Sequence, residues 1–204
     1  NVPLAGFPFH ALDNYLPKIV ESGHCVAICE QTEDPKLAKG IVKREVVEVV
    51  TPGTLVSDSY TKEKSNHFIS AISFKKSKVG FSILDTSTGE FFLGESQSDN
   101  LEECLLQFSP REIVLSEDVT YSLSNWYKNI NPFVTKIDKW IFDFDLCYST
   151  LIKHFKVHSL KGFGCESLLL GISAAGALMY HVQQNLNLNL NHISTIIPVK
   201  NDDI

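Results

Sequence analysis

The chain has 204 residues, of which 44% are hydrophobic and 21% are charged, and its formal net charge is −6. This composition is ordinary for a globular protein, and the length suits one large domain or two small ones. The negative net charge argues against a free-standing nucleic-acid-binding protein, which usually carries a basic surface. No apolar run approaches the ~20 residues of a membrane span.

The cysteines are scattered along the chain and form no CxxC pair; they are Cys25, Cys29, Cys104, Cys147 and Cys165. Most of them lie in apolar runs. We therefore expect buried, reduced thiols in a cytoplasmic protein, rather than disulfides or a metal site.

The N-terminal quarter predicts a helix followed by two strands. Apolar residues at helical spacing predict a helix over residues 9–22, ended by Gly23, with its regular part starting near Asn14 and Pro17 in its first turn. Apolar runs then predict strands over residues 25–30 and 41–51. Because this is half of an α/β unit, we expect the chain to be a fragment that lacks part of its first domain.

The middle of the chain predicts three consecutive antiparallel strands, over residues 68–74, 79–85 and 90–95. Both faces of these strands are apolar, so we expect helices to cover the sheet on both sides. Residues 52–66, which precede the first strand, are polar and rich in turn-forming residues. They are predicted to be a linker.

Helical and strand patterns alternate in the second half. Strands are predicted over 112–116, 133–137 and 192–198, and helices over 98–108, 121–129, 143–155 and 166–185, the third capped by Asp143. A helix between two strands implies a crossover. Strand 112–116 is therefore expected to lie parallel to one strand of the meander, as we call the three antiparallel strands over 68–95. The order of elements indicates a ribonuclease-H-like α/β fold, with a mixed sheet flanked by helices.

Asp85, followed by the turn 86–89, is the sharpest candidate for chemistry. In ribonuclease-H-like nucleases an aspartate on an early strand is a metal ligand, which would make this chain a magnesium-dependent nuclease or phosphotransferase. Such chemistry needs further carboxylates at the same edge, and no motif spacing singles out Glu112, Asp143 or Asp145. The alternative, which we favour, is a β-turn in which Asp85 accepts hydrogen bonds from backbone amides.

A second candidate is a basic cluster that could meet phosphate, formed by Lys36, Lys39, Lys43 and Arg44. Acidic residues alternate with these basic ones, which favours a solvated face instead of a DNA-binding module. No P-loop or GxSxG motif occurs in this sequence. The seven histidines form no zinc-binding pattern.

Long stretches of the sequence resemble one family. The later part of the mismatch-recognition domain of the MutS family of bacterial DNA mismatch repair proteins is similar to GFPFHA (6–11), YLPKIVESGHCVAICEQTEDP (15–35), KGIVKREV (39–46) and VTPGT (50–54). The connector domain of the same family resembles DTSTGEF (85–91), PREIVLSE (110–117), GFG (162–164) and SAAGALMYHVQQ (173–184).

The resemblance implies a division of the chain into four parts. Residues 1–53 would be the C-terminal part of the mismatch-recognition domain, 54–66 a linker, 67–190 the ribonuclease-H-like connector domain, and 191–204 the start of the lever domain. In the family the connector has no nuclease activity, links the DNA-bound and nucleotide-bound states, and contacts MutL.

The resemblance also implies what belongs to the parent protein alone. The family's Phe-x-Glu mismatch-reading motif and its ATPase domain would lie outside this chain, so we expect no enzymatic activity and no cofactor or metal here. ATP and magnesium, mismatched duplex DNA and dimer formation are expected of the cytoplasmic, nucleoid-associated parent. By position, the residues expected near the DNA backbone are Gln31, Glu30, Lys39, Lys43 and Arg44.

Overall fold

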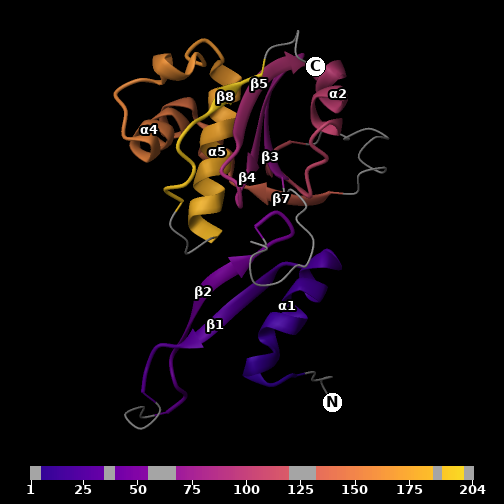
Figure 1. The fold of residues 1–204 in the computed structure, drawn as a ribbon, viewed down its shortest axis with the longest axis vertical. Coiled ribbons are helices and arrows are strands. Elements are labelled where there is room, and N and C mark those ends of the chain that lie inside the picture. Colours follow the sequence, from indigo (N-terminus) through magenta and orange to yellow (C-terminus); the bar gives the residue numbers. More distant parts are fainter. Residues whose placement is uncertain (1–5, 35–39, 55–67, 120–131, 186–189, 200–204) are drawn as a thin grey trace.

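The computed structural model describes residues 6–34, 40–54, 68–119, 132–185 and 190–199. Over these ranges the chain forms two α/β units. The small unit contains one helix and a two-stranded sheet, and the large unit is built on a six-stranded sheet. Figure 1 shows the small unit at one end of the long axis and the large unit at the other.

The small unit follows the predicted order of elements. It consists of a 3₁₀ turn, η1 (Phe9–Ala11), helix α1 (Leu12–Glu21) and the antiparallel strands β1 (Val26–Gln31) and β2 (Arg44–Val50). The helix packs Leu16 and Val20 against Val50 of β2. Its opposite side and the other face of the two strands are largely exposed.

The predicted helix over residues 9–22 is confirmed as η1 followed by α1, but the predicted start of its regular part was wrong. The helix begins at Leu12, two residues before the expected Asn14, so Pro17 is buried inside it and not in its first turn. Burial of the apolar face that includes Leu16 and Val20 outweighs the loss of one backbone donor at Pro17. The predicted end is confirmed: Gly23 has a φ of 87° and donates its N–H to the Val20 carbonyl at 2.9 Å.

The large sheet has the strand order β7-β6-β3-β4-β5-β8. The predicted meander is confirmed, since the antiparallel strands are β3 (Phe68–Lys75), β4 (Lys78–Asp85) and β5 (Phe91–Gln97). The predicted parallel strand is also confirmed: β6 (Glu112–Ser116) pairs parallel with β3, and β7 (Phe133–Ile137) pairs parallel with β6. The last strand, β8 (Ile197–Pro198), is shorter than expected and pairs with β5.

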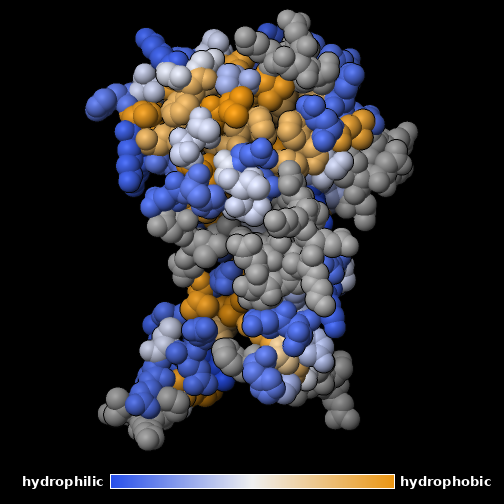
Figure 2. Space-filling model, in the orientation of Figure 1, coloured by the Kyte–Doolittle hydropathy of each residue, from blue (hydrophilic) through white to orange (hydrophobic). Residues whose placement is uncertain are grey.

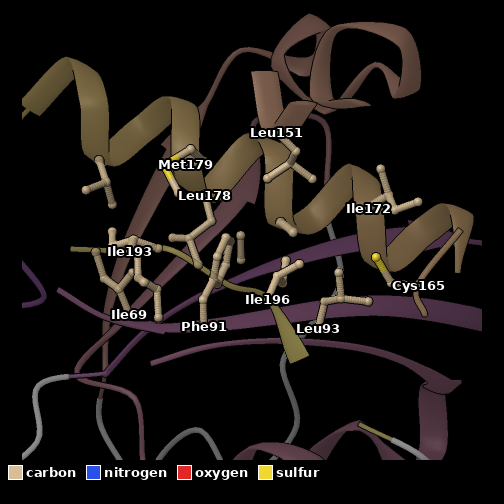
Figure 3. Packing of buried hydrophobic residues seen from close by; sticks show 14 of the residues in the cluster. Ile69, Phe91, Leu93, Leu151, Cys165, Ile172, Leu178, Met179, Ile193 and Ile196 are labelled. Atoms are coloured by element: carbon tan, nitrogen blue, oxygen red, sulfur yellow. The ribbon is translucent and has the colours of Figure 1, made fainter. Parts of the chain in front are cut away.

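Helices cover both faces of this sheet, as the apolar strands predicted. Helices α4 (Phe144–Phe155) and α5 (Leu169–Asn185) lie on one face, and α2 (Leu101–Leu106) lies on the other (Figure 1). The larger core cluster joins the sheet to α4 and α5 through residues such as Phe91, Leu151 and Leu178 (Figure 3). The chain is therefore a three-layer α/β protein with a mixed sheet in its large unit.

The N-terminus of α5 is fixed by a carboxylate from the sheet. Glu95 of β5 accepts hydrogen bonds from the backbone N–H groups of Leu170 at 2.7 Å and Gly171 at 3.4 Å. Gly80 of β4 lies so close that any Cβ would overlap the Leu170 carbonyl. The start of α4 has the predicted cap, because the Asp143 carboxylate accepts from the N–H groups of Asp145 and Leu146.

The segment that leaves the large unit, residues 190–199, is held along the α4–α5 face. Ile193 and Ile196 point into the main core cluster (Figure 3). The His154 Nε2 atom lies 2.8 Å from the Ile193 carbonyl oxygen, and the His192 Nε2 atom lies 2.8 Å from the Thr86 carbonyl oxygen. The turn after β4 thus contacts this exit segment.

The expectation of buried thiols was wrong for two cysteines. All five are free, but Cys25 and Cys29 are exposed, because only one face of the small sheet is covered by α1. The predicted helix over 121–129 lies outside the described residues. Among the described helices, none is long and apolar enough to cross a membrane.

Candidate functional site

Glu112 occupies the point where the two units meet. It is the first residue of β6, and its side chain is 0% exposed. Strands β3, β6 and β7 run in the same direction, so their N-terminal ends share one edge of the sheet. The small unit reaches this edge through the segment Thr51–Thr54, which directly follows β2.

The two carboxylate oxygens of Glu112 serve different units. Oε2 accepts hydrogen bonds from the Thr51 hydroxyl and from the Gly53 backbone N–H, the latter at 3.2 Å. Oε1 accepts from the Thr135 hydroxyl of β7 at 2.6 Å and lies 3.1 Å from Nε2 of His181 on α5. One buried side chain therefore links the end of the small unit to a strand and a helix of the large unit. We call this set of contacts the joint; it consists of Glu112, the Thr51–Thr54 turn, Thr135 and His181.

The Thr51–Thr54 turn is shaped to reach Glu112. The Thr54 hydroxyl accepts the Thr51 backbone N–H at 2.8 Å, and the two threonine hydroxyls are 2.8 Å apart. A Cβ atom on Gly53 would overlap Ile69 and stand 2.8 Å from Cβ of Glu112, so the turn needs a glycine there. The described part of the predicted linker, residues 52–54, is thus packed against the large unit.

Hydrogen bonding keeps Glu112 ionised in spite of its burial. Burial has the largest effect and would raise the pKa of this carboxyl. The hydrogen bond from His181, the charge that this ring carries when protonated, and the bonds from Thr135 and Thr51 outweigh burial and lower the pKa. The carboxylate is closed to solvent and accepts hydrogen bonds from both units. These properties suit a structural joint and not a proton donor.

Two neighbours complete the joint. Asn185, the last residue of α5, places its side-chain Nδ2 atom 3.2 Å from Nδ1 and 3.1 Å from Nε2 of His181. Cys25, just before β1, is close enough to interact electrostatically with the carboxylate. Partial desolvation, followed by the negative charge of Glu112, raises the pKa of its thiol.

Asp85 adopts the turn that the sequence favoured. Its Oδ1 atom accepts from the Ser87 N–H at 2.8 Å, the Ser87 hydroxyl at 2.6 Å and the Thr88 N–H at 3.2 Å. Its Oδ2 atom is buried and has no hydrogen-bond partner among the described residues. Over the ranges that the structure describes, no three His, Cys, Asp or Glu side chains are grouped so as to hold a metal ion.

The residues expected near DNA gather at the end of the β1–β2 ladder away from the joint. Gln31 pairs with Arg44 across the ladder, and Glu30 pairs with Glu45. All four are exposed, as is Lys43, whose ammonium forms a 2.5 Å ion pair with Glu45. Lys39 lies outside the described residues. Hydrophilic residues dominate this end of the molecule (Figure 2), and contact with DNA stays a prediction.

Sequence reasoning missed the joint. In the sequence, Glu112 is one of several carboxylates that no motif spacing singles out as a metal ligand. His181 is one of seven histidines that form no zinc-binding pattern. The available signal was a glutamate at the start of the apolar strand EIVLS, because a charge at a buried strand end requires partners. Those partners come from three distant segments, around residues 51, 135 and 181, so spacing alone does not reveal them.

Fold and joint together define a protein of two α/β units fastened by a buried carboxylate. Comparison with known proteins gives the same division: the MutS domain I family matches residues 1–59 and the MutS domain II family matches residues 66–194. The chain therefore belongs to the MutS family.

Full-length relatives support this assignment. The DNA mismatch repair protein MutS of Parabacteroides distasonis is 41% identical over 99% of this chain, and that of Phocaeicola vulgatus is 39% identical over 99%. The MutS of Salinibacter ruber is 39% identical over the whole chain. The chain spans only 23% of the length of each of these relatives.

Proposed function

We propose that this chain is the part of a DNA mismatch repair protein that connects its mismatch-recognition domain to the rest of the molecule. The observation that carries the proposal is the buried Glu112 joint. The end of the small unit hydrogen-bonds to Oε2 of Glu112 on β6, and Oε1 of the same carboxylate contacts β7 and α5. A connection made by a flexible linker alone would let the small unit move independently. A connection through a buried carboxylate fixes its position, which a domain that transmits signals requires.

The large unit is proposed to be the connector domain, with a ribonuclease-H-like fold and no nuclease activity. Three antiparallel strands followed by parallel strands, with helices on both faces, support this fold. The turn formed by Asp85 supports a structural role for that residue. We place the domain boundaries at residues 53, 66 and 190.

In the parent protein, the small unit would approach mismatched duplex DNA with its far end, near Gln31 and Arg44. The parent would act as a cytoplasmic dimer, with ATP and magnesium bound by a domain outside this chain. The large unit would contact MutL. Trp140, whose side chain is about half exposed, and the exposed Leu169 are the first residues to replace by alanine in a MutL pulldown.

The proposal is tested in the full-length parent with Thr51→Val. This change removes the hydroxyl that binds Glu112 but keeps the side-chain shape, while the DNA-proximal residues stay intact. We expect mismatch affinity within about threefold of the unmodified protein. The response of ATP turnover to mismatched DNA should fall at least about fivefold, the lower end of common coupling energies.

A matched control is Thr150→Val, which removes a hydroxyl that bonds within α4 to Leu146, away from the joint. It should leave both quantities unchanged. If Thr51→Val and Thr150→Val behave alike, the joint does not transmit the DNA-bound state and the proposed connector role is wrong.

A further inference from the structure

We infer that His181 is a positioning residue that couples the binding of the Thr51–Thr54 turn to Glu112 with the stability of the C-terminal end of α5. The inference deepens the proposed connector function and rests on it. Its basis is a continuous row of groups: the turn, the Glu112 carboxylate, the His181 imidazole and the Asn185 amide.

Glu112 divides its two oxygens between the parts that it couples. The Thr51–Thr54 turn occupies Oε2, and His181 lies at Oε1 together with Thr135. No direct bond between the turn and His181 is needed, because both act on one delocalised charge. A change in the donors at Oε2 therefore changes the proton affinity of the carboxylate that His181 faces at Oε1.

The carboxylate also decides the tautomer of His181. An ionised carboxylate only accepts hydrogen bonds, so the facing Nε2 atom must carry a hydrogen. Asn185 Nδ2 lies 3.2 Å from Nδ1 and 3.1 Å from Nε2, and in a neutral ring with a hydrogen on Nε2 only Nδ1 can accept a hydrogen bond from it. Since Asn185 ends α5, the charge at residue 112 is linked to the last turn of that helix.

Loss of the turn changes what His181 faces. Without the Thr51 hydroxyl and the Gly53 N–H, Oε2 loses its two donors, and the carboxylate is more easily protonated. A neutral side chain at position 112 attracts the hydrogen on Nε2 less than a carboxylate does, so the Nδ1–H tautomer of His181 gains population. That tautomer sets a ring N–H against the Asn185 amide and weakens the helix end.

The groups that face Glu112 are few. His181 faces it from α5, Thr135 from β7, and the Thr51–Thr54 turn from the small unit. Among the described residues, His181 is the titratable group that acts on the charge of Glu112, and that charge in turn raises the pKa of the Cys25 thiol. A pH titration followed at the Gly53 amide, which donates to Oε2, therefore reports mainly on Glu112.

The coupling is tested by amide hydrogen exchange and ¹⁵N NMR on the complete 204-residue chain. We expect Thr51→Val to accelerate exchange of amides 182–185 by about tenfold, the effect of losing one hydrogen bond to a charged group. Amides of β4, in the centre of the sheet, should keep their rates. The two-bond ¹⁵N spectrum should show Nε2–H at His181 in the unmodified chain and a rise in Nδ1–H in Glu112→Gln.

The reverse direction uses two substitutions at one position. His181→Leu removes the donor to Glu112 and should accelerate exchange of the Gly53 amide about tenfold and move its acid titration to higher pH. His181→Gln keeps an N–H donor and should restore both toward the unmodified values. A purely structural histidine would not be rescued in this way.

Three results would overturn the inference. The first is exchange in Thr51→Val that changes only at residues 51–54, and the second is uniform acceleration that includes β4. The third is a Gly53 titration that is the same in His181→Leu as in the unmodified chain. None of these measurements involves DNA or nucleotide. A negative result would therefore refute the coupling through His181 but not the connector role, which is tested separately by the response of ATP turnover to mismatched DNA in the parent protein.

Discussion

Replacing Glu112 by glutamine tests whether the joint depends on charge. The substitution keeps the size of the side chain and removes the charge that four hydrogen-bond donors share. A hydrogen bond to a charged group contributes about 1.5–3 kcal/mol and a neutral one about 0.5–1.5 kcal/mol, so each bond loses roughly 1 kcal/mol. Relief of the buried charge offsets part of this sum.

The sign of the net effect follows from the pKa of Glu112. Because the folded protein lowers this pKa, the folded state prefers the ionised form more than the unfolded state does. Glu112→Gln therefore destabilises the protein, by about 1–3 kcal/mol at pH 7 on the same hydrogen-bond values. The stabilisation by Glu112 is complete above its ordinary pKa of 4.5 and is lost as the pH falls through its lowered value.

Urea unfolding followed by near-ultraviolet circular dichroism measures this effect at pH 7 and at pH 3.5. The difference between the two proteins should shrink at the lower pH. The exposed Glu103→Gln is the control and should shift stability by less than about 0.5 kcal/mol. A Glu112→Gln effect below that value at pH 7, or an equal effect at both pH values, would refute the reasoning.

Three further predictions concern single sites. Gly53→Ala should lower the free energy of unfolding in urea by about 1–3 kcal/mol, because its Cβ overlaps Ile69. An unchanged free energy of unfolding would mean that the Thr51–Thr54 turn is not packed against Ile69 and Glu112. Asp143→Ala should cost about 1 kcal/mol by removing the cap of α4, and an unchanged midpoint would contradict that role. Iodoacetamide at pH 8 should label the exposed Cys25 and Cys29 in the native chain, detected by mass spectrometry. Cys147 should stay unlabelled, because burial and then the charge of Asp143 raise its pKa to about 12, so labelling at that site would show that the α4–α5 contact opens.

The local elements could be predicted because they follow from short-range patterns. Alternating and continuous apolar runs located the strands of the meander and β6, and the position of Gly23 located the end of α1. The start of the regular helix α1 failed, where tertiary packing overrode the penalty of Pro17, and β8 is shorter than its predicted strand. The capping of α4 by Asp143 was equally local and was predicted correctly.

The joint could not be predicted, because its parts are distant in sequence. Thr51 and Glu112 are 61 residues apart, and Glu112 and His181 are 69 residues apart. Composition even misled, since residues 52–54 have the character of a linker but are packed against Ile69 and Glu112. The exposure of Cys25 and Cys29 likewise depends on which face of the small sheet is covered.

A double-mutant cycle between Thr51→Val and His181→Leu tests the central claim most directly. These two side chains lie in different units and bind opposite oxygens of Glu112. If Glu112 couples the units, the unfolding free energies of the two single variants will not add, and the interaction energy will be about 1 kcal/mol or more. Additivity within about 0.5 kcal/mol would show that the units are joined without being coupled.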